Sequence, residues 1–180
     1  EIWYTNGSTT APTAPKVTDA FGNATIQSNT YDAEKKCWVI TFDKEVTVIG
    51  DSAFASCNTL TRVTIPDSVT TIRDQAFYYC DSLTSVIIPD NVTMIGEEAF
   101  YDCDSLTSVT IGNSVTTIGD DAFGSCDSLT RVTIPDSVTT IGDYAFLYCD
   151  SLKTVYCKPT TPPTGGYRMF YPTYGYKIYV

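Results

Sequence analysis

Residues 76–89 read AFYYCDSLTSVIIP, and residues 99–112 read AFYDCDSLTSVTIG. Almost the same letters surround five cysteines, each 23 residues after the last: Cys57, Cys80, Cys103, Cys126 and Cys149. A fixed period between about 20 and 50 residues is typical of a solenoid, in which each repeat forms one coil stacked on the next. The period therefore predicts a repeat protein, whose long surfaces suit binding better than catalysis.

Each repeat places apolar residues in the same slots, which we expect to form the core. In the second repeat these slots hold Val69, Ile72, Ala76, Phe77, Cys80, Leu83, Val86 and Ile88. The end of the repeat alternates and is rich in β-branched residues, which predicts a short strand. Proline follows this strand at Pro66, Pro89 and Pro135 and ends it, because proline has no N–H for a ladder.

The segment on the other side of each coil contains a recurring glycine, at Gly50, Gly96, Gly119 and Gly142. These glycines predict a tight turn with positive φ, although Arg73 occupies the same slot in the second coil. The following Ala-Phe-x-x-Cys run fits either a helical turn or a 3-10 turn, and the pattern does not decide between them.

The strand segment resembles the leucine-rich repeat, since Leu83-x-x-Val86-x-Ile88-x-x-Asn91 fits the Leu-x-x-Leu-x-Leu-x-x-Asn motif of that family. The rest of the coil is similar to the BspA-like class found in bacterial surface proteins. This resemblance implies a right-handed repeat solenoid with a parallel β-sheet on one face and short helical or 3-10 turns or irregular coil on the other. It also implies a secreted or outer-surface location and, for some members, adhesion to host matrix or to other cells.

One departure from the motif concerns its asparagine, which Ser68, Ser114 and Ser137 replace in other coils. An asparagine ladder therefore cannot run the length of the solenoid, although serine also bonds to backbone groups.

Three segments divide the chain. Residues 1–42 predict an N-terminal β-hairpin cap, with strands in 24–31 and 37–42 around a polar turn. Residues 43–158 hold five 23-residue leucine-rich repeats, and residues 159–180 form a Tyr-rich C-terminal cap. The strand-like ending at Val180 indicates that the native chain continues, and the start at Glu1 fits an exported protein whose signal peptide has been removed.

Composition excludes several classes of partner. The chain has 21 acidic against 11 basic residues and a net charge of −10, which makes nucleic acid a poor partner. It has no run of 18 apolar residues, so we expect no membrane insertion in this segment.

The residue types of the chain do not indicate a catalytic site. The chain has no histidine, which removes Ser-His-Asp and Cys-His catalysis as well as histidine metal sites. The repeating carboxylates at Asp81, Asp104, Asp127 and Asp150 fit turn chemistry, with weak calcium binding or a glycosidase pair as lesser alternatives. We therefore predict no enzyme activity, no metal and no cofactor.

The cysteine column predicts a ladder of buried thiols rather than disulfides. Stacked strands lie about 4.8 Å apart, slightly more than the Cβ separation that a disulfide requires. Cys157 occupies a strand slot and is expected to join the core. Cys37 lies in the N-terminal segment, where a bridge stays open as an alternative.

The outward side chains of the strands are the predicted binding site, because they bring basic and aromatic residues together on an acidic protein. The candidates are Arg62, Thr64, Ser85, Ile87, Ser108, Thr110, Arg131, Thr133, Lys153 and Tyr156. The predicted function is a non-catalytic protein-binding module of a secreted or surface-displayed bacterial protein. Its expected partner is a protein, with host extracellular proteins as one class.

Two other functions stay open. One is a structural spacer that displays another domain. The other is glycan binding through a C-terminal aromatic cluster of Tyr167, Tyr171, Tyr174 and Tyr176. That function needs several tyrosines exposed in one plane, whereas the alternative role of the cluster is to cap the hydrophobic end of the solenoid.

Overall fold

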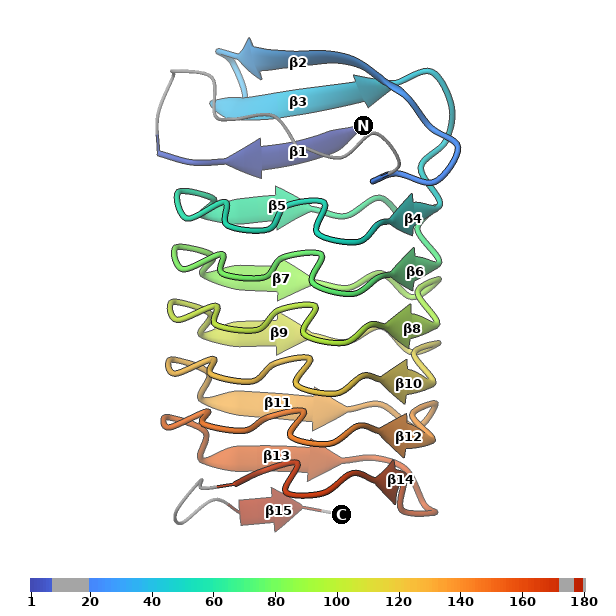
Figure 1. Ribbon diagram of the computed structural model, residues 1–180, viewed down its shortest axis with the longest axis vertical. Helices are drawn as coiled ribbons and strands as arrows, with labels where there is room; N and C mark the ends of the chain where they lie inside the picture. Colours follow the sequence, from blue (N-terminus) through green and yellow to red (C-terminus); the bar gives the residue numbers. More distant parts are fainter. Residues whose placement is uncertain (8–19, 172–176, 180) are drawn as a thin grey trace.

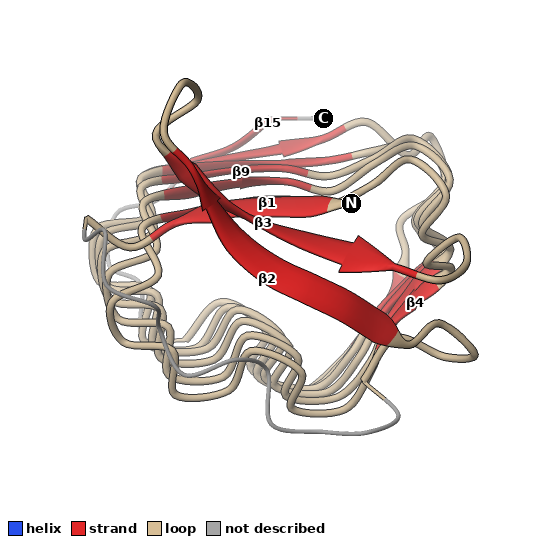
Figure 2. Ribbon diagram, turned by 90° about the horizontal axis from the view of Figure 1, so that it is seen from above, coloured by secondary structure: helices blue, strands red, loops and turns tan. Residues whose placement is uncertain are grey.

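The computed structural model describes residues 1–7, 20–171 and 177–179, which fold into a solenoid of stacked coils. The coils rise along the long axis of the molecule, with longer strands in one column and shorter strands in another (Figure 1). Seen along that axis, the coil has a third side that consists of turns (Figure 2). Each repeat therefore contributes one segment to each of three sides.

The longer strands stack in parallel, one per coil. They are β5 (Arg62–Thr64), β7 (Ser85–Ile87), β9 (Ser108–Thr110), β11 (Arg131–Ile134), β13 (Thr154–Cys157) and β15 (Lys177–Tyr179). The hydrogen-bonded order is β5-β7-β9 and then β11-β13-β15, with β9 and β11 in contact but not paired. This is the strand stack that the Leu-x-x-Val-x-Ile segment predicts.

A second parallel sheet, which the sequence analysis did not predict, lies on the next side of the coil. Its order is β14-β12-β10-β8-β6-β4, and each strand has two residues. They are β4 (Val48–Ile49), β6 (Thr71–Ile72), β8 (Met94–Ile95), β10 (Thr117–Ile118), β12 (Thr140–Ile141) and β14 (Thr164–Gly165). In each of the first five, the isoleucine is buried and its neighbour is more exposed, so the sheet contributes one core residue per coil.

The third side consists of consecutive β-turns. In residues 20–171 no helix of either kind occurs, so the expected helical or 3-10 turn is wrong and the irregular alternative is the one adopted. Turn hydrogen bonds join residues three apart, such as Tyr78 N–H to the Gln75 carbonyl at 3.1 Å. Other N–H groups on this side bond to the next coil, as Phe77 does to the Ala99 carbonyl at 2.8 Å.

Positive φ falls at two places per coil, and neither is a glycine. One series comprises Ser52, Gln75, Glu98, Asp121 and Tyr144, and the other comprises Ser56, Tyr79, Asp102, Ser125 and Tyr148. A left-handed residue interrupts the run of right-handed dihedrals that a helix needs, which is why the turn side is not helical. The expectation that positive φ lies at the recurring glycines is therefore wrong.

The recurring glycines instead lie where neighbouring coils approach closely. A Cβ on Gly119 would lie 2.6 Å from the carbonyl carbon of Gly96, and a Cβ on Gly96 would lie 2.6 Å from the carbonyl carbon of Arg73. These distances are shorter than any real carbon contact, so a side chain there would push neighbouring coils apart.

The core runs through the centre of the coils, and the predicted slots line it. All eight slots of the second coil are buried, and the phenylalanine rings of successive coils stack with centroids 5.0 to 5.3 Å apart. Cys57 and Cys157 are only half-buried, unlike Cys80, Cys103, Cys126 and Cys149. Both half-buried cysteines lie near the ends of the stack, where fewer coils cover them.

Side chains also bond from coil to coil. Serine and asparagine in the same slot both bond to the previous coil, but to different carbonyls: Ser68 Oγ donates to the Val46 carbonyl at 2.7 Å, and Asn91 Nδ2 donates to the Asp67 carbonyl at 2.7 Å. Four buried thiols donate to phenylalanine carbonyls, for example Cys103 Sγ to Phe77 at 3.3 Å. The thiol bonds are buried, whereas the serine and asparagine bonds lie nearer the surface, and all of them add links between coils to those of the backbone.

The N-terminal segment covers the first coil. Strand β1 (Ile2–Thr5) lies antiparallel between β3 (Cys37–Phe42) and β5, and β2 (Ile26–Asp32) pairs antiparallel with β3. Figure 2 shows β2 and β3 crossing the end of the solenoid. Trp38 and Ile40 join the core there, so the antiparallel strands close both the sheet edge and the apolar end.

The coil pattern continues past residue 158. Phe170 stacks on Phe146 with centroids 5.2 Å apart, and Arg168 has φ of 50°, as the left-handed residues of earlier coils do. The segment up to Tyr171 therefore forms a sixth coil, within the region predicted as a cap. The boundaries of the three predicted segments stay a prediction.

Candidate functional site

The outward side chains of the six longer strands form what we call the strand face. Strand pairing aligns them in two columns within β5-β7-β9 and within β11-β13-β15, and the 23-residue repeat continues the same order from β9 to β11, which are in contact but not paired. The cationic column contains Arg62, Ser85, Ser108, Arg131, Thr154 and Lys177. The apolar column contains Thr64, Ile87, Thr110, Thr133, Tyr156 and Tyr179.

Most predicted strand-face candidates are accessible. Arg62, Thr64, Ile87, Ser108, Thr110, Arg131, Lys153 and Tyr156 are exposed, while Ser85 and Thr133 are half-buried. Among the described residues, Ile87 is the most exposed large apolar side chain, at 68%. Tyr156 is 40% exposed and stacks on Tyr179 of the next strand, with centroids 5.1 Å apart. The face therefore offers apolar and aromatic contact area to a partner.

A threonine ladder borders the cationic column. Thr84 Oγ1 donates to the Thr61 carbonyl at 3.1 Å, and Thr107 Oγ1 donates to the Thr84 carbonyl at 3.0 Å. At the cap, Thr61 Oγ1 also donates to the Thr5 carbonyl at 2.9 Å. These bonds use up the hydroxyl donors, so the threonines stiffen the backbone rather than offer protons to a ligand.

The C-terminal aromatic candidates are in part brought together. Tyr167 and Tyr171 are 56% and 47% exposed, and their rings lie 4.9 and 4.6 Å from the guanidinium carbon of Arg168. Tyr167 stands edge-on to Tyr144 at 86°, so these two rings do not form a flat platform. Tyr174 and Tyr176 lie outside the described residues.

A second group of tyrosines, which the sequence analysis did not select, lies on the turn side. Tyr78 and Tyr101 stack with centroids 5.5 Å apart, and Tyr79 meets Tyr78 edge-on at 4.4 Å. Tyr101 fits because the next coil has Gly124 in the same slot, where a Cβ would lie 2.9 Å from its ring. The 23-residue spacing of Tyr78 and Tyr101 is the signal that could have identified this group.

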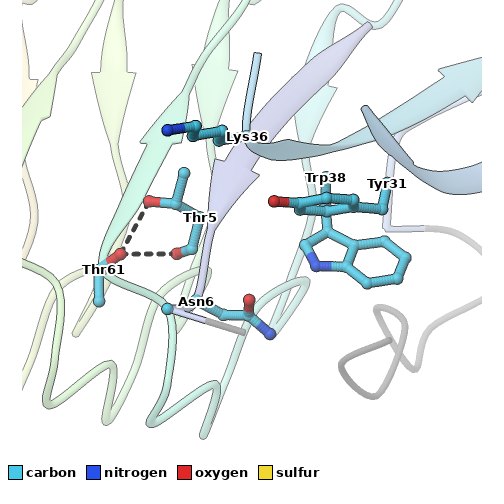
Figure 3. A pocket seen from close by; sticks show the side chains of 7 residues that line it. Thr5, Asn6, Tyr31, Lys36, Trp38 and Thr61 are labelled. Carbon is cyan, nitrogen blue, oxygen red and sulfur yellow. Dashed lines mark hydrogen bonds between the residues drawn. The ribbon is translucent and has the colours of Figure 1, made fainter. Parts of the chain in front are cut away.

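A pocket of about 380 Å³ lies where the N-terminal strands meet the first coil (Figure 3). Thr5, Asn6, Gly7, Tyr31, Lys36, Trp38 and Thr61 line it. The Tyr31 and Trp38 rings lie 5.6 Å apart, and Trp38 is buried, so little of its ring face is available for a ligand. No sequence signal identifies this pocket, because its lining comes from three separate segments.

The repeating carboxylates lie at the edges of the coils. Partial burial, together with the charges of Asp104 and Asp150, raises the pKa of Asp127, and burial with Asp104 likewise raises the pKa of Asp102. In the described ranges, no group of three or more carboxylate or thiol side chains is placed to hold a metal ion. The repeating carboxylates therefore concentrate negative charge at the edges of the coils but do not form a metal-coordination site there.

The buried thiols are expected to be unreactive. Burial raises the pKa of Cys103 and of Cys149 to about 12, and it raises the pKa of Cys80 and Cys126 as well. Only the thiolate is a nucleophile, so these cysteines act as packing groups with a weak S–H donor.

Comparison with solved structures finds bacterial leucine-rich repeat proteins. A leucine-rich repeat protein from Bacteroides ovatus is 40% identical, with a TM-score of 0.60, over 65% of this chain and 31% of the other. A leucine-rich repeat protein from T. pallidum is 38% identical, with a TM-score of 0.62, over 63% of this chain and 53% of the other. The chain thus spans a third to about half of these proteins.

A leucine-rich cell surface protein from Faecalibacterium prausnitzii is 36% identical, with a TM-score of 0.51, over 66% of this chain and 38% of the other. No curated protein matches the chain in sequence. Among the described residues, none belongs to a helix that is long and apolar enough to cross a bilayer.

The sequence model of the BspA-type leucine-rich repeat region matches residues 24–172 in six copies. The match extends past residue 158, as the stacked coils do. The match covers most of the chain, and the solved relatives share both its repeat and its stacked coils. The resemblance drawn from the strand motif is confirmed, and the chain belongs to the BspA-type leucine-rich repeat family.

Proposed function

We propose that this domain is a non-catalytic binding module of a secreted or surface-displayed bacterial protein, and that it binds a protein partner through the strand face. Adhesion to host matrix or to other cells is the use that fits such a module. The observation that carries the proposal is the combination of exposed cations, Ile87 and Tyr156 on one side of the solenoid, where the stacks β5-β7-β9 and β11-β13-β15 lie in contact.

Three considerations support the proposal. Arginine and tyrosine are the side chains most often found as anchors of protein interfaces. Stacked repeats hold such anchors at fixed spacing on a stiff backbone, which lowers the entropic cost of binding. A similar protein is described as a cell surface protein, which fits the proposed location.

The test is a binding screen against immobilised matrix proteins and bacterial cells with two matched variants. Ile87→Ser with Tyr156→Ser removes the apolar contacts of the strand face. Tyr79→Ser with Tyr148→Ser removes exposed side chains from the turn side and serves as the control. We expect the first variant to bind at least about tenfold more weakly, because exposed anchors dominate interface energy, and the control to bind as the parent does.

Equal binding by both variants would remove the strand face from consideration. Absence of any protein partner would favour the structural spacer.

Glycan binding is the second candidate, since Tyr167 and Tyr171 are exposed on either side of Arg168. A glycan array hit that Tyr167→Ser with Tyr171→Ser abolishes, and that the strand-face variant leaves intact, would move the site to this cluster.

A further inference from the structure

The charges of the protein are separated between its faces. The whole chain has a net charge of −10, yet the outward residues of the longer strands include Arg62, Arg131 and Lys177 and no carboxylate, and the exposed Lys153 directly precedes β13. Carboxylates lie in the turns on either side, such as Asp81 before β7 and Asp90 after it. The strand face is therefore a strip of positive charge bordered by negative charge.

These strand-face cations are not used for internal ion pairing. Over residues 1–7, 20–171 and 177–179, the one ion pair within 4.0 Å joins Lys35 to Asp32 in the N-terminal hairpin turn. Arg62 and Arg131 are exposed and have no carboxylate at that distance in those ranges. Pairing within the chain would relieve the self-repulsion of an acidic protein. Because Arg62 and Arg131 have no such ion pair, their charges are available to an external anion.

The two arginines are spaced for an extended chain. Both belong to the cationic column and are three coils apart, or about 14 Å at the usual strand separation of about 4.8 Å. The first two of these steps are paired strands, and the third is the contact of β9 with β11. An extended peptide advances about 3.3 Å per residue, so residues i and i+4 are about 13 Å apart and point to the same side. Arginine binds carboxylates through two parallel N–H···O bonds, which favours this side chain for such a contact.

The middle of this span is apolar. Residue i+2 of the same peptide would also point toward the face, opposite the second and third coils. There Ile87 is 68% exposed in the neighbouring column, on the same strand as Ser85 and opposite Thr110 of the next coil. An aliphatic side chain at i+2 of the peptide would cover Ile87. A sulfated sugar would cover Ile87 less well, because the surface of the sugar is polar.

We propose that the strand face binds an acidic, extended segment of a partner protein laid along the solenoid axis. Carboxylates four residues apart contact Arg62 and Arg131, and an apolar side chain between them contacts Ile87. This inference rests on the proposed function and specifies the chemistry of its partner.

The test uses the isotope-labelled 180-residue domain and a nine-residue peptide of threonine and valine. The peptide has glutamate at its third and seventh positions and leucine at its fifth. A control peptide has the same composition with the two glutamates adjacent. We expect amide shifts centred on Arg62, Ile87 and Arg131, and binding several-fold tighter than that of the control peptide, because one adjacent pair cannot reach both arginines.

Two protein variants provide matched controls for charge. Arg62→Glu with Arg131→Glu should weaken binding of the peptide about tenfold or more, since like charges replace both contacts. Lys44→Glu with Arg73→Glu makes the same change in net charge at exposed sites away from the strand face and should leave binding nearly unchanged. Binding should also weaken as salt rises, because the Debye length falls from about 10 Å at 0.1 M to about 3 Å at 1 M.

Several outcomes would overturn the inference. These are shifts confined to other faces, equal binding of the two peptides, or a sulfated polysaccharide that binds the same residues more tightly than the peptide. Concentration-dependent self-association, lost in the arginine variant while the peptide does not bind, would make a second copy of this chain the occupant.

The proposed function can be separated from this inference. A captured protein partner that is lost with Ile87→Ser and Tyr156→Ser, while no acidic peptide binds, would leave the strand face as the binding site and refute only the acidic partner.

Discussion

At the scale of the residue, the stacked phenylalanines tie each coil to the next. Phe100 is fully buried and lies between Phe77 and Phe123, with centroids 5.0 and 5.2 Å away and nearly parallel rings. Such rings contribute through their large apolar area and through offset stacking. A side chain in this position therefore supports two interfaces between coils at once.

Phe100→Ala should lower the free energy of unfolding by about 3–5 kcal/mol, because it removes a buried ring and leaves a cavity between two coils. Urea unfolding followed by circular dichroism measures the loss. Tyr148→Ala, at an exposed position on the turn side, should change stability by no more than about 0.5 kcal/mol. Similar small losses for both variants would contradict the assignment of Phe100 to the core.

The thiols differ in reactivity according to their burial. Iodoacetamide at pH 8 should label Cys57 and Cys157 first, because both side chains are only half-buried. Cys103 and Cys149 should resist, since burial raises their pKa to about 12 and leaves almost no thiolate at that pH. Mass spectrometry of digested protein locates the labels, with labelling in urea as the control for full access. Rapid labelling of native Cys103 would show that its slot is open.

Residue identities predicted the core slots well, because a 23-residue repeat forces each apolar letter into the same environment in every coil. They predicted the glycines for the wrong reason. The need for Gly119 comes from the backbone of Gly96 in the previous coil, a contact that does not exist until the coils stack. Arg73 in the same slot was the available hint that positive φ was not the cause.

At the scale of the element, the second sheet shows what a sequence pattern cannot display. A strand of two residues, such as β6, has no alternation to detect, and its hydrogen bonds are formed entirely with neighbouring coils. The longer strands were visible because Leu-x-x-Val-x-Ile spans several alternating positions. The left-handed residues of the turn side had no visible signal either, since Gln75, Glu98 and Tyr144 share no chemical feature.

The acidic edge of the coils gives stability a dependence on pH. The pKa of Asp102 and of Asp127 is raised, first by burial and then by neighbouring carboxylates. A raised pKa means that the folded state binds the proton more tightly than the unfolded chain, whose aspartates titrate near 4. The protein should therefore gain stability as pH falls from 7 toward about 4, and this gain is lost as pH rises through the folded-state pKa.

Two carboxylates of the N-terminal segment act in the opposite direction. The backbone N–H of Lys35 donates to Asp32, and the backbone N–H of Thr25 donates to Asp43; each bond lowers the pKa of the aspartate that accepts it. The stability that these two aspartates contribute is therefore present above their unfolded-state pKa and is lost as pH falls through their folded-state pKa. The melting temperature should accordingly rise from pH 7 to about pH 4 and fall in stronger acid. A steady decrease from pH 7 to pH 5 would contradict the expected effect of the edge.

Asp104 is the carboxylate that Asp102 and Asp127 share as a neighbour. Asp104→Asn should raise the melting temperature at pH 7 and flatten its rise on acidification, because it removes the shared repulsion. Asp67→Asn makes the same change at an exposed position in another turn and should have a smaller effect. Scanning calorimetry at low salt measures both, since salt screens such interactions. Equal effects of the two variants would show that net charge alone, and not the edge, controls stability.

At the scale of the whole molecule, the candidate binding surface could be predicted because it follows from the repeat. Once the strand was placed, its outward residues were known, and most of them are exposed as expected. The turn-side tyrosines and the pocket beside Trp38 depend on how separate segments meet in space, so they were not found. The repeat pattern does not identify the partner of the strand face, so we inferred the chemistry of that partner from the alignment of charges across coils.

The solenoid also predicts how the molecule opens. Each coil contacts only its neighbours, so stability is close to a sum over coils and interfaces, and opening starts where a coil has fewer neighbours. The first coil is covered by β1 and by the β2–β3 hairpin, whereas the sixth coil, whose strand is β15, is followed by no further coil among the described residues. We therefore expect amide protection to be highest in residues 69–134 and to decrease toward 158–171.

Phe170→Ala tests this gradient, because Phe170 joins the sixth coil to Phe146 of the fifth. Hydrogen exchange followed by mass spectrometry should show faster exchange in residues 141–171 and unchanged exchange in residues 69–90. The phenylalanine of the middle coil offers the contrast: Phe100→Ala should speed exchange on both sides of residue 100, since its ring contacts two neighbouring coils. If Phe170→Ala speeds exchange equally in every coil, the solenoid opens as one cooperative unit. That result would contradict the model in which stability is a sum over separate coils and interfaces.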